Sequence, residues 1–375
     1  MNFELTEEQL LLKDSVERFV KDNYELEKRR KLSAADPGFS RDNWAKMAEL
    51  GWLGMPFAEA DGGFGGNQID TMVIMEQVGK GLVLEPFFAS IVLGGSVMRN
   101  AASTAQKAEL LPRIIDGSKQ LTLAYAEEQA RFDLHDVTTT ARADGDGFVI
   151  NGHKSMVPNA ATASHILVSA RTGGGQIDEN GISLFLVESG ATGVERQNFP
   201  TVDGLRASEV SFKDVRVDAG SLIGELNRGF PVLKIAAADG ILALCAEAVG
   251  AMEVLYRDTV EYTQQRVQFD HPLSDFQVLQ HRMVDMFMEY EQCKSLLYRA
   301  TLETVSNGPN AAERTVHALK HLVGKSGISI GENAVQLHGG MGMTEELRIG
   351  HYFKRLLVID LQFGNAAHHL QKFAA

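Results

Sequence analysis

Residues 137–157 read VTTTARADGDGFVINGHKSMV, and this stretch decides the class of fold. Threonine, valine and isoleucine favour strands, while the Asp-Gly at 144 and the Asn-Gly at 151 are dipeptides typical of tight turns between strands. Short β-rich runs of the same kind, such as LTLAYAEE, HILVSAR and GISLFLVES, lie on both sides. The pattern predicts a β domain over residues 121–226.

Helical patterns flank this β domain on both sides. Thr6 and Gln9 have the spacing of a capping box, which predicts a helix that begins near Thr6. Apolar residues then recur with a helical period over two sets of segments, about 41–50, 68–80, 86–101 and 104–116 before the β domain, and about 230–265, 273–307, 310–337 and 344–371 after it. We therefore expect an α+β chain with a helical domain at 1–120 and another at 227–375.

Composition excludes several classes of protein. The 36 Lys and Arg against 49 Asp and Glu give a net charge of −13, which argues against nucleic acid as the main partner. The first residues carry acids where a targeting peptide would carry bases, and the longest apolar stretch, 82–98, is interrupted by Glu85, Pro86 and two glycines. We expect a cytoplasmic protein without a membrane span.

Metal binding is not predicted. His317 and His321 stand four residues apart, a spacing that can place two imidazoles on one metal, but the segment HALKH has no glutamate and no third ligand is evident. The pair at 368–369 is either a pH-sensitive group or a solvated helix end, and the second interpretation is favoured. Cys245 and Cys293 lie in apolar helical stretches and are expected to be buried thiols.

Two local patterns have a possible binding role. Arg266, Phe269 and Gln277 surround the turn DHP, and they form either a helix-end clamp for an anion and a planar group or an exposed arginine beside a packed aromatic corner. By itself the pattern favours the second interpretation. The segment GGMG at 339–342 lies between two predicted helices, where backbone amides can approach a ligand closely.

A resemblance to a known family joins these two patterns. QRVQFDHPLSDFQVLQHRMVDM (265–286) and AVQLHGGMGMTEELRI (334–349) resemble the acyl-CoA dehydrogenase family, which has R-x-x-F-G-x-x-L-x-x-F-Q followed by Q-x-x-G-G-x-G. DGFVINGHK (146–154) and EVSFKDVRV (209–217) are similar to parts of its β domain. The resemblance covers nearly the whole chain and implies a helical N-terminal domain, a middle β-barrel or sandwich, and a C-terminal four-helix bundle.

The resemblance also implies FAD as cofactor and an acyl-CoA thioester as substrate. In this family a carboxylate removes the α proton and the β hydrogen leaves as hydride to the flavin. The clamp residues, which by similarity bind the adenine and pyrophosphate end of FAD across a subunit interface, are Arg266, Phe269, Gln277, Gln336, Gly339 and Gly340. This implies at least a dimer, with an electron-transfer flavoprotein as the expected acceptor.

The chain departs from the family at the base. Where the family has Tyr-Glu-Gly-Thr, this chain reads QFGN, so Phe363 occupies the commonest position of the catalytic glutamate. The alternative position falls on Gly240, and Asp239 is the acid beside it. Asp239 is therefore the candidate base; the other interpretation is an acid at a helix N-terminus, favoured by the helix dipole.

The flavin-ring segment also departs from the family. Ala126 and Pro158 replace threonines, and Arg131-Phe132 replaces Gly-Ser, which removes hydroxyl donors and small residues. An altered ring site beside a clamp that is intact apart from Asp270, where the family usually has glycine, is expected in a mixed oligomer.

The segments LEPFFA, DGLRASEV and QLHGGMGMTEELRIGHYFKR are similar to small subunits of pimeloyl-CoA dehydrogenase type and to paired dehydrogenases of steroid side-chain breakdown. This similarity implies an α2β2 assembly, or a homo-oligomer, that acts on a bulky or dicarboxylic acyl-CoA. The alternatives are a non-catalytic subunit that retains FAD and, less favoured, a flavin oxidase on the same fold.

Overall fold

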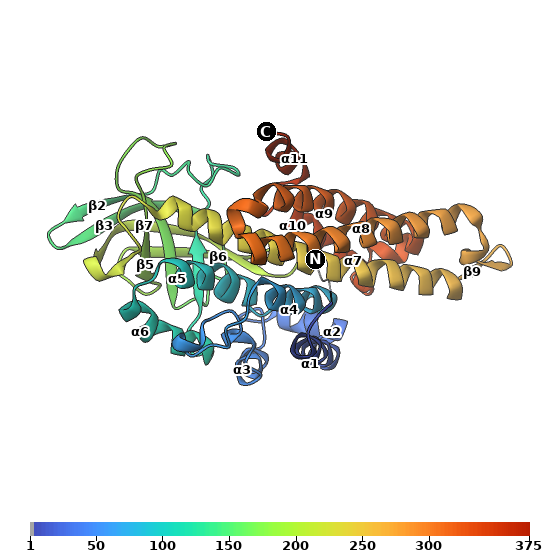
Figure 1. The fold of residues 1–375 in the computed structure, drawn as a ribbon. Coiled ribbons are helices and arrows are strands. Elements are labelled where there is room, and N and C mark those ends of the chain that lie inside the picture. Colours follow the sequence, from blue (N-terminus) through green and yellow to red (C-terminus); the bar gives the residue numbers. More distant parts are fainter. Residues whose placement is uncertain (1–3) are drawn as a thin grey trace. The chain divides into compact units, whose positions relative to one another are not determined.

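The structure is a computed structural model that describes residues 4–375 (Figure 1). Its elements follow the predicted order of helices, strands and helices. Contacts divide the chain into two compact units. The helical unit comprises the residues up to Lys31, Gln68–Val83 and Ile241–Ala375, and the sheet unit comprises Leu32–Asn67 and Leu84–Gly240. The expected boundaries at residues 120 and 226 follow chain order and stay a prediction.

The helical unit begins with α1 (Glu7–Asn23), and Thr6 is its N-cap. The Thr6 hydroxyl accepts the backbone N–H of Gln9, and the Gln9 side chain accepts that of Thr6, so the predicted capping box is confirmed. The other elements that lie wholly or partly in this unit are α2 (Leu26–Ala34), α4 (Gln68–Gly81), α7 (Gly229–Gln265), β9 (Val267–Gln268), β10 (His271–Pro272), η5 (Leu273–Asp275), α8 (Gln277–Asn307), α9 (Pro309–His338), η6 (Gly339–Met343), α10 (Arg348–Leu361) and α11 (Ala366–Ala374).

Close backbone approach and a buried ion pair fix α7 within this unit. A Cβ at Gly79 of α4 would overlap the carbonyl oxygen of Glu247, and one at Gly250 of α7 would overlap that of Glu76. Glycine at both positions therefore lets the two helices pack with their backbones in contact. The Glu247 carboxylate also binds the Arg355 guanidinium of α10 in a bidentate pair at 2.5 and 2.7 Å.

One predicted helix, 344–371, is wrong in length. The structure has α10 and α11 with a break between them, because Phe363 and Gly364 have positive φ angles of 58° and 113°. Asn365 then caps α11 by accepting the backbone N–H of His368. The pattern 86–101 likewise divides into a π-helical segment, η3 (Phe88–Gly94), and α5 (Gly95–Ala101).

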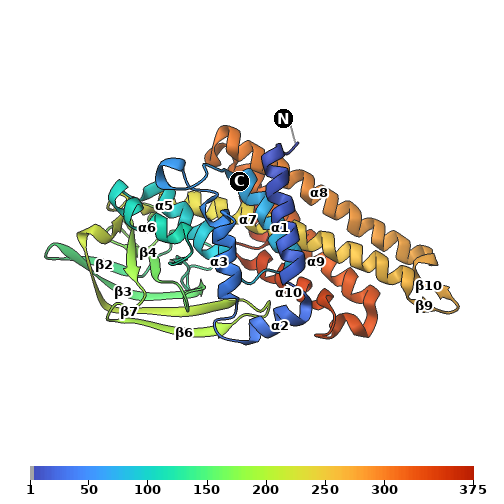
Figure 2. The same cartoon turned by 90° about the horizontal axis from the view of Figure 1, so that it is seen from below.

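The sheet unit contains a mostly antiparallel sheet with the order β6-β7-β3-β2-β4-β5-β8, and β1 pairs in parallel with β4 (Figure 2). Its strands are β1 (Leu121–Ala124), β2 (Thr140–Asp144), β3 (Gly147–Pro158), β4 (His165–Arg171), β5 (Ile182–Glu188), β6 (Val194–Pro200), β7 (Arg206–Asp218) and β8 (Leu222–Ile223). β6 and β8 have no counterpart among the strands expected from the sequence. The helical elements of this unit are α3 (Arg41–Glu49), η1 (Trp52–Gly54), η2 (Glu59–Asp61), η3, α5, α6 (Thr104–Ile115), η4 (Ala219–Ser221) and the first turns of α7.

The two predicted turns in 137–157 have different outcomes. The Asp-Gly turn is confirmed, because Asp144 of β2 pairs with Gly147 of β3 across a two-residue loop. The Asn-Gly turn is wrong, because both residues lie inside β3, where the pairing with β7 shifts register between Ile150 and Gly152. A β-bulge thus takes the place of a chain reversal.

The structure shows where the two cysteines lie and how long and apolar the helices are. Cys245 and Cys293 are both fully buried free thiols, as predicted. Of the helices in residues 4–375, none is both long enough and apolar enough to span a membrane.

Candidate functional site

The end of α7 carries the first part of the candidate clamp. Arg266 directly follows α7 and opens the β9–β10 hairpin, which projects beyond the ends of α7 and α8 in both views (Figures 1 and 2). The hairpin reverses at Phe269 and Asp270, whose φ angles are 54° and 63°. Phe269 is 85% exposed, and the Arg266 side chain is exposed too. Both side chains are therefore accessible to a ligand or to another chain.

The start of α8 completes this corner. The backbone N–H of Leu273 donates to the carbonyl of Arg266 at 2.9 Å, which closes the hairpin. Phe276, the N-cap residue of α8, meets Phe269 edge to face, with ring centroids 6.3 Å apart. Gln277 is the exposed first residue of α8. The three predicted residues of this segment thus lie on one corner.

The end of α9 is joined to the end of α7 by a ring stack. Tyr262 lies four residues before Arg266, and His338 directly precedes Gly339. Their rings stack with centroids 4.3 Å apart and planes 25° apart. His338 donates from Nδ1 to the carbonyl of Ala334, and burial lowers the pKa of its ring. The stack brings the two halves of the clamp, about 70 residues apart in sequence, to the same end of the helical unit.

The glycines of the clamp have room for a ligand. Gly339 has a φ of 61°, a conformation that favours glycine. A Cβ built on Gly339 or on Gly340 would meet no atom within 4 Å, so the space beside this backbone is open. Gln336, in the last turn of α9, is exposed. Together these residues offer a guanidinium, an aromatic face, two amide side chains and open backbone, which suits an anionic ligand with a planar group.

Asp239, the candidate base, has close polar partners. It lies in the third turn of α7, because the helix begins at Gly229, and its side chain is 6% exposed. Its Oδ2 accepts a hydrogen bond from the Ser96 hydroxyl at 2.7 Å and one from Nη2 of Arg99 at 3.0 Å. Burial lowers the pKa of Arg99, and the Asp239 carboxylate opposes that change. The expectation of a helix-start acid is wrong, because α7 begins ten residues before Asp239 and α5 supplies the partners of its carboxylate.

Phe363 lies in the loop between α10 and α11, and hydrogen bonds from α9 and α11 fix the backbone there. Lys320 of α9 is fully buried, and its ammonium donates to the carbonyls of Ile359, Asp360 and Gly364 at 2.8–2.9 Å. These include the last carbonyls of α10, where a cation is favoured by the helix dipole. Nε2 of His369 lies 3.1 Å from the carbonyl of Phe363. Hydrogen bonds therefore fix the backbone around Phe363, the residue that by resemblance replaces the family base and that carries no carboxylate.

The histidines have structural partners. Nδ1 of His317 lies 2.8 Å from Nδ1 of His369, and Nδ1 of His321 donates to the carbonyl of Ala366 at 2.8 Å. His369 is 1% exposed and burial lowers its pKa to about 3, so the expectation of a solvated helix end is wrong for this residue. In the described part of the chain, residues 4–375, no group of three or more His, Cys, Asp or Glu side chains is placed to hold a metal.

Of the flavin-ring residues predicted from the sequence, Ala126, Arg131 and Phe132 lie between β1 and β2, and Pro158 ends β3. A buried ion pair joins this connection to β3. The Lys154 ammonium lies 2.7 Å from Oε1 of Glu127 and 2.9 Å from the Ser169 hydroxyl. The Glu127 carboxylate also accepts the backbone N–H groups of Thr138 and Thr139 at 2.8 and 3.1 Å. Burial raises the pKa of Glu127, but the Lys154 charge outweighs this and brings it to about 2. Burial lowers the pKa of Lys154 to about 8.

Comparison with known proteins decides the family. The family models described as acyl-CoA dehydrogenase N-terminal, middle and C-terminal domains match residues 6–118, 122–215 and 227–375. The chain belongs to the acyl-CoA dehydrogenase family. It therefore has the three-domain architecture of that family, whose members are FAD-dependent oxidoreductases that act on a CH–CH bond.

Individual acyl-CoA dehydrogenases match over almost their whole length. The probable acyl-CoA dehydrogenase YngJ of Bacillus subtilis is 29% identical over 98% of this chain and 97% of its own. The crystal structure of an acyl-CoA dehydrogenase from Geobacillus kaustophilus is 26% identical, with a TM-score of 0.92 over 99% of this chain and 98% of its own. The steroid acyl-CoA dehydrogenase Tcur3481–Tcur3483 is 26% identical, with a TM-score of 0.88 over 98% and 97%.

The two halves of an FAD site differ in how well they suit this cofactor. The clamp suits the adenosine diphosphate end, because Arg266 is exposed and the backbone at Gly339 and Gly340 is open. The ring segment suits the flavin less well, since Ala126 and Pro158 have no side-chain hydrogen-bonding group. The Asn159 side chain, next to Pro158, is also engaged, because it donates to Gln120 at 3.1 Å.

Several residues important for these sites were not found by sequence reasoning. Ser96 and Arg99 precede Asp239 by 143 and 140 positions. Nothing in the sequence around them indicates this contact. Lys320 did give a signal, since a lysine stands among apolar residues on the buried face of a helix. Lys154 gave the same kind of signal, since it is a lysine inside a strand that is otherwise largely apolar. A buried lysine needs acceptors, so both positions predict a local polar network.

Proposed function

We propose that the chain is one subunit of a mixed acyl-CoA dehydrogenase oligomer, and that its clamp binds FAD held mainly by a partner subunit. The observation that carries this proposal is the Tyr262–His338 stack, which gathers an exposed and complete clamp at one end of the helical unit. An exposed arginine and an exposed phenylalanine at the end of the helical unit suit a ligand that a second chain brings.

The residues at the two candidate base positions support a catalytic base on the partner subunit and cofactor binding by this chain. Phe363 has no ionisable group, and the Asp239 carboxylate already binds Arg99 and Ser96. A carboxylate in a buried ion pair is costly to release, because the guanidinium would be left without its partner. We infer that the proton-abstracting carboxylate of the assembly belongs to the partner subunit, while this chain binds the cofactor and completes the assembly.

FAD, when bound, accepts the hydride from the β carbon of the acyl group. Arg266 would neutralise part of the pyrophosphate charge, Phe269 would cover a planar part of the cofactor, and the amides near Gly339 would donate to its oxygens. The proposed substrate is a bulky or dicarboxylic acyl-CoA, in line with the steroid acyl-CoA dehydrogenase among the similar structures. The proposed assembly is an α2β2 tetramer in the cytoplasm that passes electrons to an electron-transfer flavoprotein.

A second candidate keeps the base on this chain, at Asp239. Two observations favour considering it: the side chain is buried, and it adjoins Gly240, the alternative base position of the family. In that case Arg99 and Ser96 would orient the carboxylate.

The flavin oxidase on the same fold would be recognised by reaction with oxygen in place of an electron-transfer flavoprotein.

The test is to purify the chain together with the product of a neighbouring gene and to count flavins per polypeptide by absorbance and protein assay. We expect fewer than one FAD per polypeptide in an active mixed complex. The chain purified alone should not retain a full complement of flavin. A pure homo-oligomer of this chain with one tightly bound FAD per polypeptide would contradict the proposal.

A further inference from the structure

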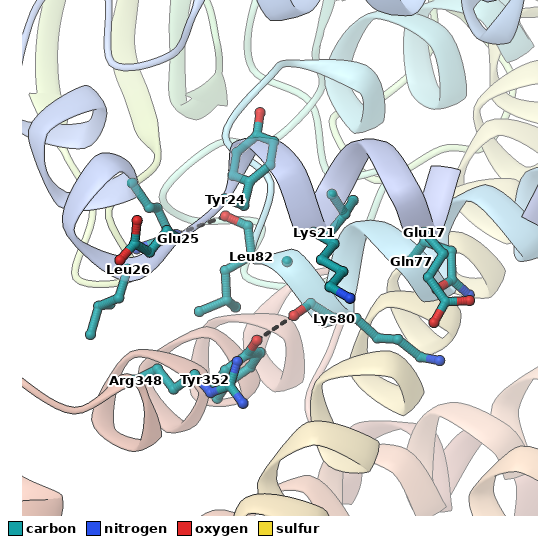
Figure 3. Close-up of a pocket in the computed structure, with 13 residues that line it drawn as sticks. Glu17, Lys21, Tyr24, Glu25, Leu26, Gln77, Lys80, Leu82, Arg348 and Tyr352 are labelled. Atoms are coloured by element: carbon teal, nitrogen blue, oxygen red, sulfur yellow. Dashed lines mark hydrogen bonds between the residues drawn. The ribbon is translucent and has the colours of Figure 1, made fainter. Parts of the chain in front are cut away.

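A cavity among α1, α2, α4 and α10 of the helical unit has a volume of about 490 Å³, and several polar groups of its wall already have partners (Figure 3). The Tyr352 hydroxyl and Nε of Arg29 donate to the backbone carbonyls of Lys80 and Leu82. The Lys80 ammonium is paired with Glu253 at 3.0 Å. These contacts hold the helices together, and we assign the cavity no ligand.

A cluster of three side chains on the sheet unit is not used by the proposed function. His153 of β3 and Ser211 of β7 are register partners in neighbouring antiparallel strands, so their side chains lie on the same face of the sheet (Figure 2). Glu209 precedes Ser211 by two positions and therefore shares that face of β7. Val210 and Phe212 point into the core on the other face and are 0% and 2% exposed. The cluster thus lies on the solvent face.

The hydrogen bonds of the cluster are those that activate a serine. Nδ1 of His153 lies 3.0 Å from the Ser211 hydroxyl, and Nε2 lies 2.8 Å from Oε2 of Glu209. Because a carboxylate can only accept, the neutral ring carries its proton on Nε2 and donates it to Glu209, which leaves Nδ1 to accept from the Ser211 hydroxyl. A nucleophile bonded to a base that a third group orients is the arrangement of nucleophilic catalysis.

The backbone of β3 holds His153 in place. The pairing with β7 shifts register on both sides of residues 152–154, so His153 lies in a short paired segment between two irregularities. Bulges of this kind occur often beside active sites, where they redirect a side chain. The next residue, Lys154, points to the opposite face, where its buried ammonium binds Glu127 and Ser169 at 2.7 and 2.9 Å. This anchor fixes the strand from which the imidazole projects.

The Glu209 carboxylate is placed independently of the imidazole. Met156 lies in the second irregularity of β3 with a φ of 53°, and its backbone N–H donates to Oε1 of Glu209 at 3.2 Å. The two carboxylate oxygens thus have separate partners, the Met156 N–H and the His153 ring. The His153 side chain is 49% exposed, so a reagent in solution can reach the cluster.

We propose that Ser211 is a nucleophile that takes an acyl group from a small activated ester, with His153 as its base and Glu209 as the residue that orients the base. The Ser211 oxygen attacks the ester carbonyl carbon while its proton passes to Nδ1 of His153. The bond from the serine oxygen to the acyl carbon forms, the bond to the leaving alcohol or phenol breaks, and the leaving oxygen takes the proton from His153. The product is an O-acyl serine. The site is separate from the clamp and does not depend on the proposed subunit role.

The test treats the full-length chain with p-nitrophenyl acetate. Release of p-nitrophenolate follows the reaction, and peptide mapping by mass spectrometry locates the acetyl groups and gives the rate at each serine. Ser221 is an internal control, because its hydroxyl donates to the Asp218 carboxylate at 3.1 Å and not to an imidazole. We expect Ser211 to be acetylated about tenfold or more faster than Ser221, since an imidazole is the better general base near neutral pH.

Four variants assign the roles. Ser211→Ala should lose most of the p-nitrophenolate release, and His153→Gln should slow acetylation of Ser211 about a hundredfold, the lower end of what a general base contributes. Glu209→Gln keeps an oxygen that can accept from the ring but loses the charge, so it should slow the reaction about tenfold. His281→Gln, which changes an exposed histidine of α8, is the matched control and should react as wild type does. Equal melting temperatures check that the sheet is preserved.

Three outcomes would overturn the proposal. The first is acetylation of lysines with Ser211 unmodified. The second is an equal rate of Ser211 acetylation in wild type and His153→Gln. The third is release of p-nitrophenolate by Ser211→Ala as fast as by wild type, which would make the imidazole itself the nucleophile.

Discussion

Tyr262 near the end of α7 and His338 at the end of α9 stack with their ring centroids 4.3 Å apart. Each ring lies within four residues of a clamp residue, Arg266 in one case and Gly339 in the other. The stack therefore fixes the distance between two parts of the clamp that do not adjoin in sequence. Aromatic pairs of this kind contribute about 0.5–1.5 kcal/mol beyond the burial of their area.

The first prediction concerns this stack. Tyr262→Ala should weaken FAD binding by the assembled complex about tenfold, because the two parts of the clamp are no longer held in register, while Tyr262→Phe should bind FAD as wild type does. Flavin fluorescence titration measures the affinity, and far-UV circular dichroism checks that the helices persist. Equal FAD affinity in the alanine and phenylalanine variants would mean that the stack does not position the clamp.

The second prediction concerns Arg266. Its replacement by alanine removes a charge-assisted contact with the cofactor pyrophosphate and should cost about 1.5–3 kcal/mol of FAD binding in the assembled complex. Gel filtration of the flavin-loaded complex at high dilution reports the loss directly. The matched control is Arg18→Ala, an exposed arginine of α1. If Arg266→Ala and the control retain flavin equally, Arg266 is not part of a cofactor site.

The third prediction separates structure from catalysis at Asp239. Asp239→Asn should lower the free energy of unfolding by about 1–3 kcal/mol, because the half-buried Arg99 guanidinium loses its anionic partner. Because Arg99 is only partly buried, combining the change with Arg99→Met in a double-mutant cycle, measured by urea denaturation, should reveal the coupling between the two residues.

The activity of the same variant distinguishes the two candidate functions. In the mixed complex Asp239→Asn should keep α,β-dehydrogenation within about threefold of wild type, equivalent to about 0.65 kcal/mol of barrier. A loss of a hundredfold or more, with FAD content and assembly preserved, would place the base on this chain.

The fourth prediction concerns the pH dependence of stability at Glu85. This carboxyl is 5% exposed, its Oε1 accepts the backbone N–H of Ser40, and its Oε2 has no partner. Burial raises its pKa from 4.5 to about 7. The unfolded chain therefore loses this proton at lower pH than the folded chain does, and the contribution of Glu85 to stability falls as the pH rises from about 4.5 to about 7.

Glu85→Gln has no such titration, so it should gain stability relative to wild type across that interval, by up to about 3 kcal/mol at pH 8. Its side-chain oxygen can still accept the N–H of Ser40. Urea unfolding of both proteins at pH 5 and pH 8 supplies the comparison. A difference between them that does not change with pH would show that Glu85 titrates normally in the folded chain.

Local features were predictable because they depend on residues close together in sequence. The Thr6–Gln9 capping box is a contact across three positions, and the Asp-Gly turn between β2 and β3 needs only its own dipeptide and the strands beside it. The clamp residues follow from the sequence only through the resemblance to a family, since the local pattern alone favours a packed corner. The break at Phe363 was missed because helical periodicity continues through it.

The sequence by itself determined the succession of helices and strands, the burial of Cys245 and Cys293, and the absence of a glutamate at position 363. Only the tertiary structure decided the partners of Asp239, the acceptors of Lys320 and the stack of Tyr262 on His338. Secondary structure follows from backbone preferences and from the period of apolar residues, which neighbouring positions set. The partner of a buried polar group depends instead on which faces of distant elements pack together, and nothing in the local sequence around Asp239 specifies Arg99, 140 positions away.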